Sequence, residues 1–231
     1  MKNSKLIAVM MCALIVLSGC NMNNTTKGGL IGGGGGAAVG ALVGNLIGKD
    51  TKGTAIGAAI GAVVGTGAGV LIGKKMDKAK AAAEAVNNAQ VESITDANGL
   101  QAVKVTFDSG ILFATNKADL NSAAKNSLNQ FATTVLNVNT DMDVAILGHT
   151  DNTGTDAINN PLSLQRAQSV SNYLKSCGVA AKQLKTIEGK GSTQPVADNS
   201  TADGRQQNRR VEVYIYASQE MIQAAENGTL K

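Results

Sequence analysis

Apolar residues in the C-terminal half of the chain recur with two different periods, which predicts strands alternating with helices. Val91–Thr95 and Leu100–Phe107 are rich in β-branched residues and flank Asn98-Gly99, a pair typical of a β-hairpin turn. Further strands are expected at 144–147, 183–189 and 209–217. Two predicted helices separate these strands and give the order βαβαβ with a closing strand. This order predicts an α/β (α+β) sandwich with its helices on one face of the sheet.

The two helices are predicted because apolar residues recur at spacings of three and four. The first covers residues 121–138 and the second covers residues 161–177. Pro161 suits the first turn of the second helix, and Gly178 lies just past its end. The residues expected on the buried faces are Leu128, Phe131, Val135 and Val138 in the first helix and Leu162, Ala167, Val170 and Leu174 in the second.

The N-terminus has the pattern of an export signal rather than that of a membrane span. Lys2 and Lys5 precede the apolar run Leu6–Leu17, whose 12 residues are too few to cross a bilayer. A spanning helix needs roughly 20 apolar residues. We therefore expect a signal peptide at residues 1–19.

The end of this signal, Leu17-Ser18-Gly19-Cys20, resembles the bacterial lipoprotein signal, in which cleavage precedes a cysteine that is then acylated. The resemblance implies lipid on Cys20 and a lipidated tether at 20–29. The alternative is an ordinary cleaved signal with an incidental cysteine. An aspartate after the cysteine tends to retain such lipoproteins in the inner membrane, and Asn21 lacks that signal. We therefore expect the outer membrane.

Glycines at every fourth position dominate residues 30–73. Two uncharged runs, 30–48 and 53–73, are separated by a polar turn at 49–52. A spacing of four places the glycines along one helical face, so that two helices can pack closely. This pattern predicts a membrane-associated glycine-zipper helical hairpin, with a flexible linker as the alternative. Each run holds only 7 Leu, Ile or Val residues, which leaves membrane spanning open.

One short segment precedes the mixed domain and another follows it. Residues 74–89 are rich in Ala, Lys and Glu, with Lys80 and Glu84 spaced i,i+4, which predicts a short exposed connecting helix that acts as a spacer. Residues 219–231 are assigned to a C-terminal tail. Residues 90–218 remain as the mixed domain, which is long enough to bury one core.

Composition excludes several classes of protein. The chain has 231 residues, of which 16% are charged and 3% aromatic, and its formal net charge is +4. Without a platform of aromatic and basic residues, these values argue against nucleic-acid binding. Three cysteines without a CxxC pair, and a single histidine, argue against a structural zinc site and a disulfide framework. We expect no cofactor.

Several motifs of the mixed domain occur together between residues 107 and 211. They are Phe107-Asp108-Ser109, Gly148–Gly154, Asn159 with Leu162–Ala167, Gly189-Lys190-Gly191, Pro195, Asn199, Gly204-Arg205 and Asn208–Val211. In this order they resemble the OmpA-like peptidoglycan-binding domain. Together with the glycine zipper and the lipoprotein signal, they make the chain similar to the YiaD-type envelope lipoproteins. Ile158 departs from the pattern, because relatives often carry an aromatic residue there, so one pocket wall can differ.

The resemblance implies binding to the peptidoglycan stem peptide, which in Gram-negative cells contains meso-diaminopimelate. The side-chain end of this residue carries an ammonium and a carboxylate, so its binding calls for a fixed anion and a fixed cation. Asp151 follows a central strand and Arg166 lies on the next helix, which lets them converge at the end of the sheet. We assign Asp151 to the ammonium and Arg166, bidentate, to the carboxylate. The further pocket members that the resemblance implies are Asn116, Thr153, Asn159 and Arg209.

The leading hypothesis is a lipid-anchored outer-membrane protein that binds peptidoglycan without a covalent bond and ties membrane to wall. The alternative is a glycine-zipper assembly protein, forming a homo-oligomer, whose wall binding only positions it. An enzyme is not expected. His149 lies near Asp151, but no second histidine and no activated serine accompany it, and Cys177 fits a helix end. The expected partners are peptidoglycan and membrane lipid.

Overall fold

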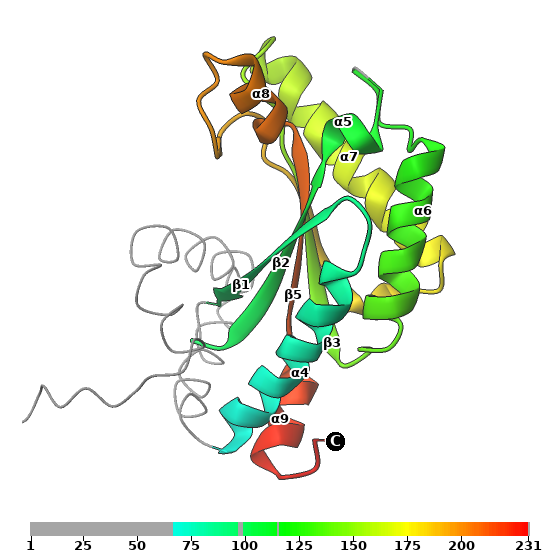
Figure 1. Ribbon diagram of the computed structural model, residues 1–231, viewed down its shortest axis with the longest axis vertical. Coiled ribbons are helices and arrows are strands. Elements are labelled where there is room, and N and C mark those ends of the chain that lie inside the picture. Colours follow the sequence, from blue (N-terminus) through cyan, green and yellow to red (C-terminus); the bar gives the residue numbers. More distant parts are fainter. Residues whose placement is uncertain (1–66, 97–98, 115, 231) are drawn as a thin grey trace, which may run out of the picture. The chain divides into compact units, whose positions relative to one another are not determined.

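The computed structural model describes residues 67–96, 99–114 and 116–230, which build one five-stranded sheet and its helices (Figure 1). The strand order is β1-β2-β5-β3-β4, in which only β3 and β4 are parallel neighbours. The strands are β1 Ala89–Thr95, β2 Gln101–Asp108, β3 Met142–Gly148, β4 Leu184–Gly189 and β5 Arg210–Ala217. The mixed α/β sheet expected from the sequence is confirmed, with the closing strand β5 between β2 and β3.

Helices flank the sheet and connect most of its strands, and side-chain caps mark where four of them begin. The helices are α4 Gly67–Glu84, α5 Ser109–Leu112, α6 Ser122–Phe131, α7 Asp156–Ser176, α8 Ala202–Asn208 and α9 Gln219–Glu226. A π-helix, Ala132–Leu136, continues α6, and a 3-10 turn, Ala181–Gln183, precedes β4. Backbone N–H groups at the starts of α5, α6, α8 and α9 donate to the side chains of Asp108, Asn121, Thr201 and Ser218.

The two faces of the sheet differ in chemistry. On β5, Val211, Val213 and Ile215 belong to the main core with the residues of α6 and α7, which lie on one side of the sheet in Figure 1. The alternate residues of β5, including Glu212 and Tyr214, are also buried but belong to the opposite face. The helices therefore cover one apolar face, while the other face carries buried polar groups.

Two glycines let α7 lie close against the parallel strands. A Cβ at Gly148, the last residue of β3, would lie 2.0 Å from the backbone oxygen of Ser163. A Cβ at Gly189, the last residue of β4, would lie 2.4 Å from the backbone nitrogen of Leu164. Any larger residue would push α7 away from the sheet. These glycines therefore set the position of the helix that carries Arg166.

The structure corrects two details of the expected helices. Helix α7 begins at Asp156 rather than at Pro161, so Pro161 lies inside the helix and not in its first turn. The helix tolerates the loss of one backbone N–H donor there because its other turns remain bonded. Val138 was expected on the buried face but is 67% exposed. The cause is the π-helix that ends at Leu136, which breaks the helical period before Val138 is reached.

The helix expected before the mixed domain is present, but it is not an exposed spacer, and most of the segment assigned to a C-terminal tail forms a second helix. Helix α4 buries one face of evenly spaced small and apolar residues against β1, β2 and the π-helix. Helix α9 packs beside α4 (Figure 1) and buries Met221, Ile222 and Ala225 in the same core. The buried residues of α4 are Ala68, Ile72, Met76, Ala79 and Ala83. Both segments are therefore parts of the folded domain.

Most of the features expected in the N-terminal 73 residues lie in a part of the chain that the structure does not describe. The expected signal peptide, the expected lipidation of Cys20 and the expected glycine-zipper hairpin up to residue 66 lie outside the described residues. The last part of the glycine tract, Gly67–Gly73, forms the start of α4. Within residues 67–96, 99–114 and 116–230, no helix has the length and apolar character that a bilayer crossing requires.

Candidate functional site

One pocket of about 720 Å³ lies at the end of the sheet where β3 ends and β5 begins. Three backbone segments converge there because the N–H of Ser109 donates to the carbonyl of Arg209 and that of His149 donates to the carbonyl of Arg210, both at 2.9 Å. The pocket is lined by Ser109, Gly110, Phe113, Ala114, Asn116, Thr150, Asp151, Thr153, Asn159, Leu162, Arg166 and Arg209. The structure thus brings all six residues named from the sequence to one cavity.

Asp151 provides the carboxylate of this pocket. It lies three residues beyond β3, and its side chain is 9% exposed. One carboxylate oxygen accepts the backbone N–H of Thr153 at 2.8 Å, and the other pairs with Nη1 of Arg209 at 2.5 Å. Burial opposes ionisation, but these hydrogen bonds outweigh it, so the pKa of Asp151 is lowered. The carboxylate is therefore charged at neutral pH.

Arg166 supplies a buried cation to the pocket. The residue is 4% exposed, its Nε donates to the carbonyl of Lys117 at 3.1 Å, and its guanidinium carbon lies 5.2 Å from the centre of the Phe113 ring. Among the described residues it forms no ion pair with a carboxylate. Burial and the positive charge of Arg209 lower the pKa of Arg166, although Asp151 acts in the opposite direction. The guanidinium is thus held in place but is electrostatically unsatisfied.

The other named residues have different positions around this pair. Asn159 is 3% exposed and donates to the carbonyls of Asp151 and Thr153 at 3.4 and 3.2 Å, so it fixes the shape of the loop that carries the carboxylate. Asn116 is exposed at the rim with a φ of +56°, a conformation that asparagine tolerates better than most residues. Arg209 is the C-cap of α8 and precedes β5, whereas the sequence placed it in the strand.

Six lining residues were not named as site residues from the sequence, and three of them carry a hydroxyl or an aromatic ring. The hydroxyls of Ser109 and Thr150 are buried and have no hydrogen-bond partner within the described part of the chain. Phe113 forms the surface beneath the guanidinium of Arg166. Ser109 and Thr150 belong to the motifs quoted above, so the signal was present. Only the fold shows that their side chains line the same cavity as Asp151.

His149 lies behind the pocket and does not line it. It is 1% exposed, and its Nε2 is 3.3 Å from a carboxylate oxygen of Glu212 on the opposite face of the sheet. Burial lowers the pKa of His149, and nearby Arg210 adds to this effect, although Glu212 opposes it. A neutral imidazole in this position is enclosed by protein rather than presented to a ligand.

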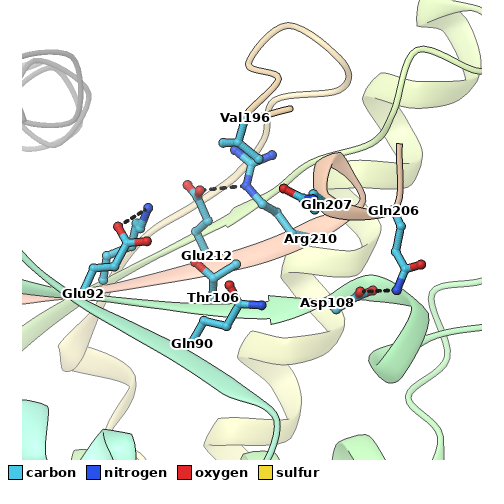
Figure 2. Close-up of a pocket in the computed structure, with 10 residues that line it drawn as sticks. Gln90, Glu92, Thr106, Asp108, Val196, Gln206, Gln207, Arg210 and Glu212 are labelled. Atoms are coloured by element: carbon cyan, nitrogen blue, oxygen red, sulfur yellow. Dashed lines mark hydrogen bonds and ion pairs between the residues drawn. The ribbon is translucent and has the colours of Figure 1, made fainter. Parts of the chain in front are cut away.

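A second hollow of about 370 Å³ lies on the opposite face of the sheet, over β1, β2 and β5 (Figure 2). Its charged groups are satisfied within the protein. Arg210 pairs with Glu212 at 2.8 Å, and Asp108 accepts from Gln206 at 3.1 Å (Figure 2). This hollow therefore lacks the unsatisfied buried charge that distinguishes the first pocket. Within the described part of the chain, no cluster of His, Cys, Asp and Glu side chains could hold a metal ion.

Two family models match this chain, each over a different part of it. Residues 112–209 match the OmpA family, and this segment contains all six named site residues. Residues 1–77 match the YMGG-like Gly-zipper family. The combination expected from the motifs, an OmpA-like domain preceded by a glycine zipper, is therefore confirmed.

Individual relatives agree with this assignment. The chain is 42% identical over 114 residues to the peptidoglycan-binding protein ArfA of Mycobacterium tuberculosis, covering 49% of this chain and 34% of that protein. It is also 42% identical over 111 residues to the probable lipoprotein YiaD of Escherichia coli, covering 48% of this chain and 47% of that protein. The chain thus spans less than half the length of either relative.

Solved structures support the fold. A putative MotB like protein from Desulfovibrio vulgaris superposes with a TM-score of 0.53 and 22% identity, covering 65% of this chain and 92% of that one. At this identity the likeness concerns the fold alone. The chain is thus similar to the OmpA family over residues 112–209 and to the YMGG-like Gly-zipper family over residues 1–77.

Proposed function

We propose that the OmpA-like domain binds peptidoglycan without a covalent bond, through the diaminopimelate of the stem peptide. The observation that carries this proposal is the guanidinium of Arg166, which is 4% exposed and lacks an acidic partner among the described residues. A buried charge without a counter-ion is costly, and a ligand carboxylate would remove that cost. The name of the relative ArfA, a peptidoglycan-binding protein, supports the same ligand.

The assignment of groups follows from charge. The ligand carboxylate pairs with Arg166, whose fork of N–H donors matches a carboxylate in bidentate geometry. The ligand ammonium pairs with Asp151, whose carboxylate is ionised at neutral pH. Asn159 and Thr153 hold the Asp151 loop, and Asn116 contributes an amide at the rim. These groups bind and orient a zwitterion, and the proposal includes no catalytic step.

The proposal extends to the location of the protein. Lipid on Cys20 would anchor the chain in the outer membrane, with the OmpA-like domain facing the periplasm and holding the wall. At least two acyl chains give stable anchoring, whereas one is marginal. The name of YiaD, a probable lipoprotein, supports the anchor. Incorporation of labelled palmitate into the wild type, and its loss in Cys20→Ser, tests it.

Sedimentation with purified sacculi tests the binding itself. The full-length chain in detergent should sediment with the wall, whereas Asp151→Asn and Arg166→Gln should stay in solution. Removing one partner of a desolvated charge pair costs roughly 2–5 kcal/mol, which is enough to abolish sedimentation. Lys125→Gln is the matched control, because it removes an exposed charge on α6 outside the pocket. Equal sedimentation of all four proteins would disprove the assignment, and release of soluble muropeptides would indicate a hydrolase instead.

The YMGG-like Gly-zipper match favours one further role, assembly in or on a membrane. In that case glycine-lined helices associate, and wall binding only positions the assembly. Gly61→Leu would place a large side chain on the glycine face. Loss of crosslinked oligomers in this variant, with wall binding intact, would support assembly as a separate function. Unchanged crosslinking would argue against it.

A further inference from the structure

The charges in the binding pocket do not balance. Its lining contains one carboxylate, Asp151, and two guanidiniums, Arg166 and Arg209, while every other lining residue is uncharged. A zwitterionic ligand end brings one positive and one negative charge. Its binding would therefore leave one guanidinium of the pocket without a counter-ion.

In the free domain, Arg209 occupies the position that the ligand ammonium requires. Its Nη1 lies 2.5 Å from one oxygen of Asp151, and the other oxygen accepts the N–H of Thr153. Both carboxylate oxygens are thus already bonded. Each oxygen can accept a second donor, but an ammonium beside Asp151 would then face the positive charge of Arg209, so its binding is favoured when that guanidinium moves away.

Arg209 is the donor that can leave. The N–H of Thr153 belongs to the turn that carries Asp151, so it cannot move independently. The backbone of Arg209 is fixed, because its carbonyl accepts the N–H of Ser109 and its own N–H donates to the carbonyl of Arg205. Its side chain, however, is 38% exposed, against 9% for that of Asp151. A long, partly solvated side chain on a fixed backbone can turn to a new partner.

We infer that Arg209 stands in for the ligand ammonium in the free domain, and that on binding it releases Asp151 and pairs with a second carboxylate of the stem peptide. This inference rests on the proposed function. The complete ligand then carries one ammonium and two carboxylates, which matches one carboxylate and two guanidiniums. The pocket thereby distinguishes stem peptides whose carboxylates are free from those in which they are amidated.

Two groups of the stem peptide have the required chemistry. One is the α-carboxylate of the D-glutamate, which stays free because this residue is linked through its γ-carboxyl. The other is the α-carboxylate of a C-terminal diaminopimelate. Both are carboxylates a short distance from the diaminopimelate side-chain end, so the pocket chemistry is the same for either, and amidation of each in turn identifies the one used.

Calorimetric titration of the full-length chain in detergent tests the inference. The probes are the tripeptide L-Ala-γ-D-Glu-meso-diaminopimelate, the same peptide with D-isoglutamine, and the same peptide with an amidated C-terminus. For the wild type, one of the two amidations should weaken binding by about tenfold or more, as loss of a hydrogen-bonded charge partner does. In Arg209→Gln the free and the amidated peptide should bind alike, whereas Arg209→Lys should keep part of the difference.

The titrations distinguish a failure of the Arg209 inference from a failure of the proposed function. If amidation weakens binding equally in wild type and Arg209→Gln, or weakens neither, Arg209 has no carboxylate partner and the inference is wrong, while binding of the free peptide still supports the proposed function. If no peptide and no sacculus binds the wild type, the proposed function and the inference both fail. Lys125→Gln serves as the control, and urea unfolding of Arg209→Gln and Arg209→Lys shows whether each variant is folded.

Discussion

Replacing Arg166 by methionine should abolish wall binding without destabilising the domain. Methionine keeps an unbranched apolar side chain against Phe113 but removes the charge. A residue retained for folding would behave differently, because its loss would cost stability. The substitution therefore separates a ligand-binding role of Arg166 from a structural one.

The contacts of the Arg166 guanidinium give the expected change in the free energy of unfolding. The variant loses a hydrogen bond from a charged donor to the carbonyl of Lys117, worth about 1.5–3 kcal/mol, and a cation–π contact with Phe113, worth about 0.5–2 kcal/mol. It also avoids burying a charge without an acidic partner, a penalty of several kcal/mol per ion. The two effects nearly cancel. The free energy of unfolding should stay within about 1 kcal/mol of the wild type or rise above it.

Urea unfolding of both full-length proteins, followed by circular dichroism, measures this difference. Sacculus sedimentation of the same preparations measures binding. The expected result is an unchanged or higher unfolding midpoint together with lost sedimentation. A fall of more than about 3 kcal/mol, the cost of breaking a buried ion pair, would refute the reasoning and make Arg166 a structural residue.

Three further substitutions test the fold. Gly148→Ala places a methyl group 2.0 Å from the backbone oxygen of Ser163 and should cost about 1–3 kcal/mol or more in urea unfolding; a stable variant would mean that α7 is not held where we describe it. Burial and, less strongly, Glu220 raise the pKa of Asp143 to about 6, so the wild type should lose about 1–2 kcal/mol of stability between pH 4 and 6, after allowance for solvent screening. Asp143→Asn should remove this pH dependence, and an unchanged profile of stability against pH would contradict the role of Asp143. Met221→Ala should cost about 2–5 kcal/mol because Met221 is 1% exposed in α9, whereas a disordered tail would tolerate the change.

Proton linkage gives the direction in which Asp143 makes stability change with pH. Its pKa in the folded state is higher than the ordinary value of 3.8, so the folded state binds more protons than the unfolded state between these pH values. Stability therefore falls as pH rises through this window. Asp151 has a lowered pKa and behaves in the opposite way, since its stabilising contribution is lost as pH falls.

Local pattern was enough to locate the strands, whereas the proposed site residues came from the resemblance of several motifs to a known family. The alternation of β-branched residues and the Asn98-Gly99 turn signal gave the hairpin of β1 and β2 to within two residues at each end. The order of the motifs identified Asp151 and Arg166, because they are short, local combinations of residue types. Such signals depend only on neighbours in the sequence.

Burial of the flanking helices was not predicted correctly, for a physical reason. The buried face of α4 consists mainly of alanines, and its other faces carry lysines, so the segment has the composition of a solvated helix. It is buried because Met221 and Ile222, about 150 residues later, pack in the same core as its alanines. Such long-range contacts leave no mark on local composition.

The sequence by itself therefore determined the class of fold and the hairpin, and its motifs led to the proposal that Asp151 and Arg166 bind a zwitterion. The tertiary structure alone decided that Asp151 pairs with Arg209 and leaves Arg166 without an acidic partner among the described residues. The reason is that pairing depends on which side chains meet where three backbone segments converge. Residue types fix the charges of a site, whereas the fold fixes their distances, and a Coulomb interaction depends on both.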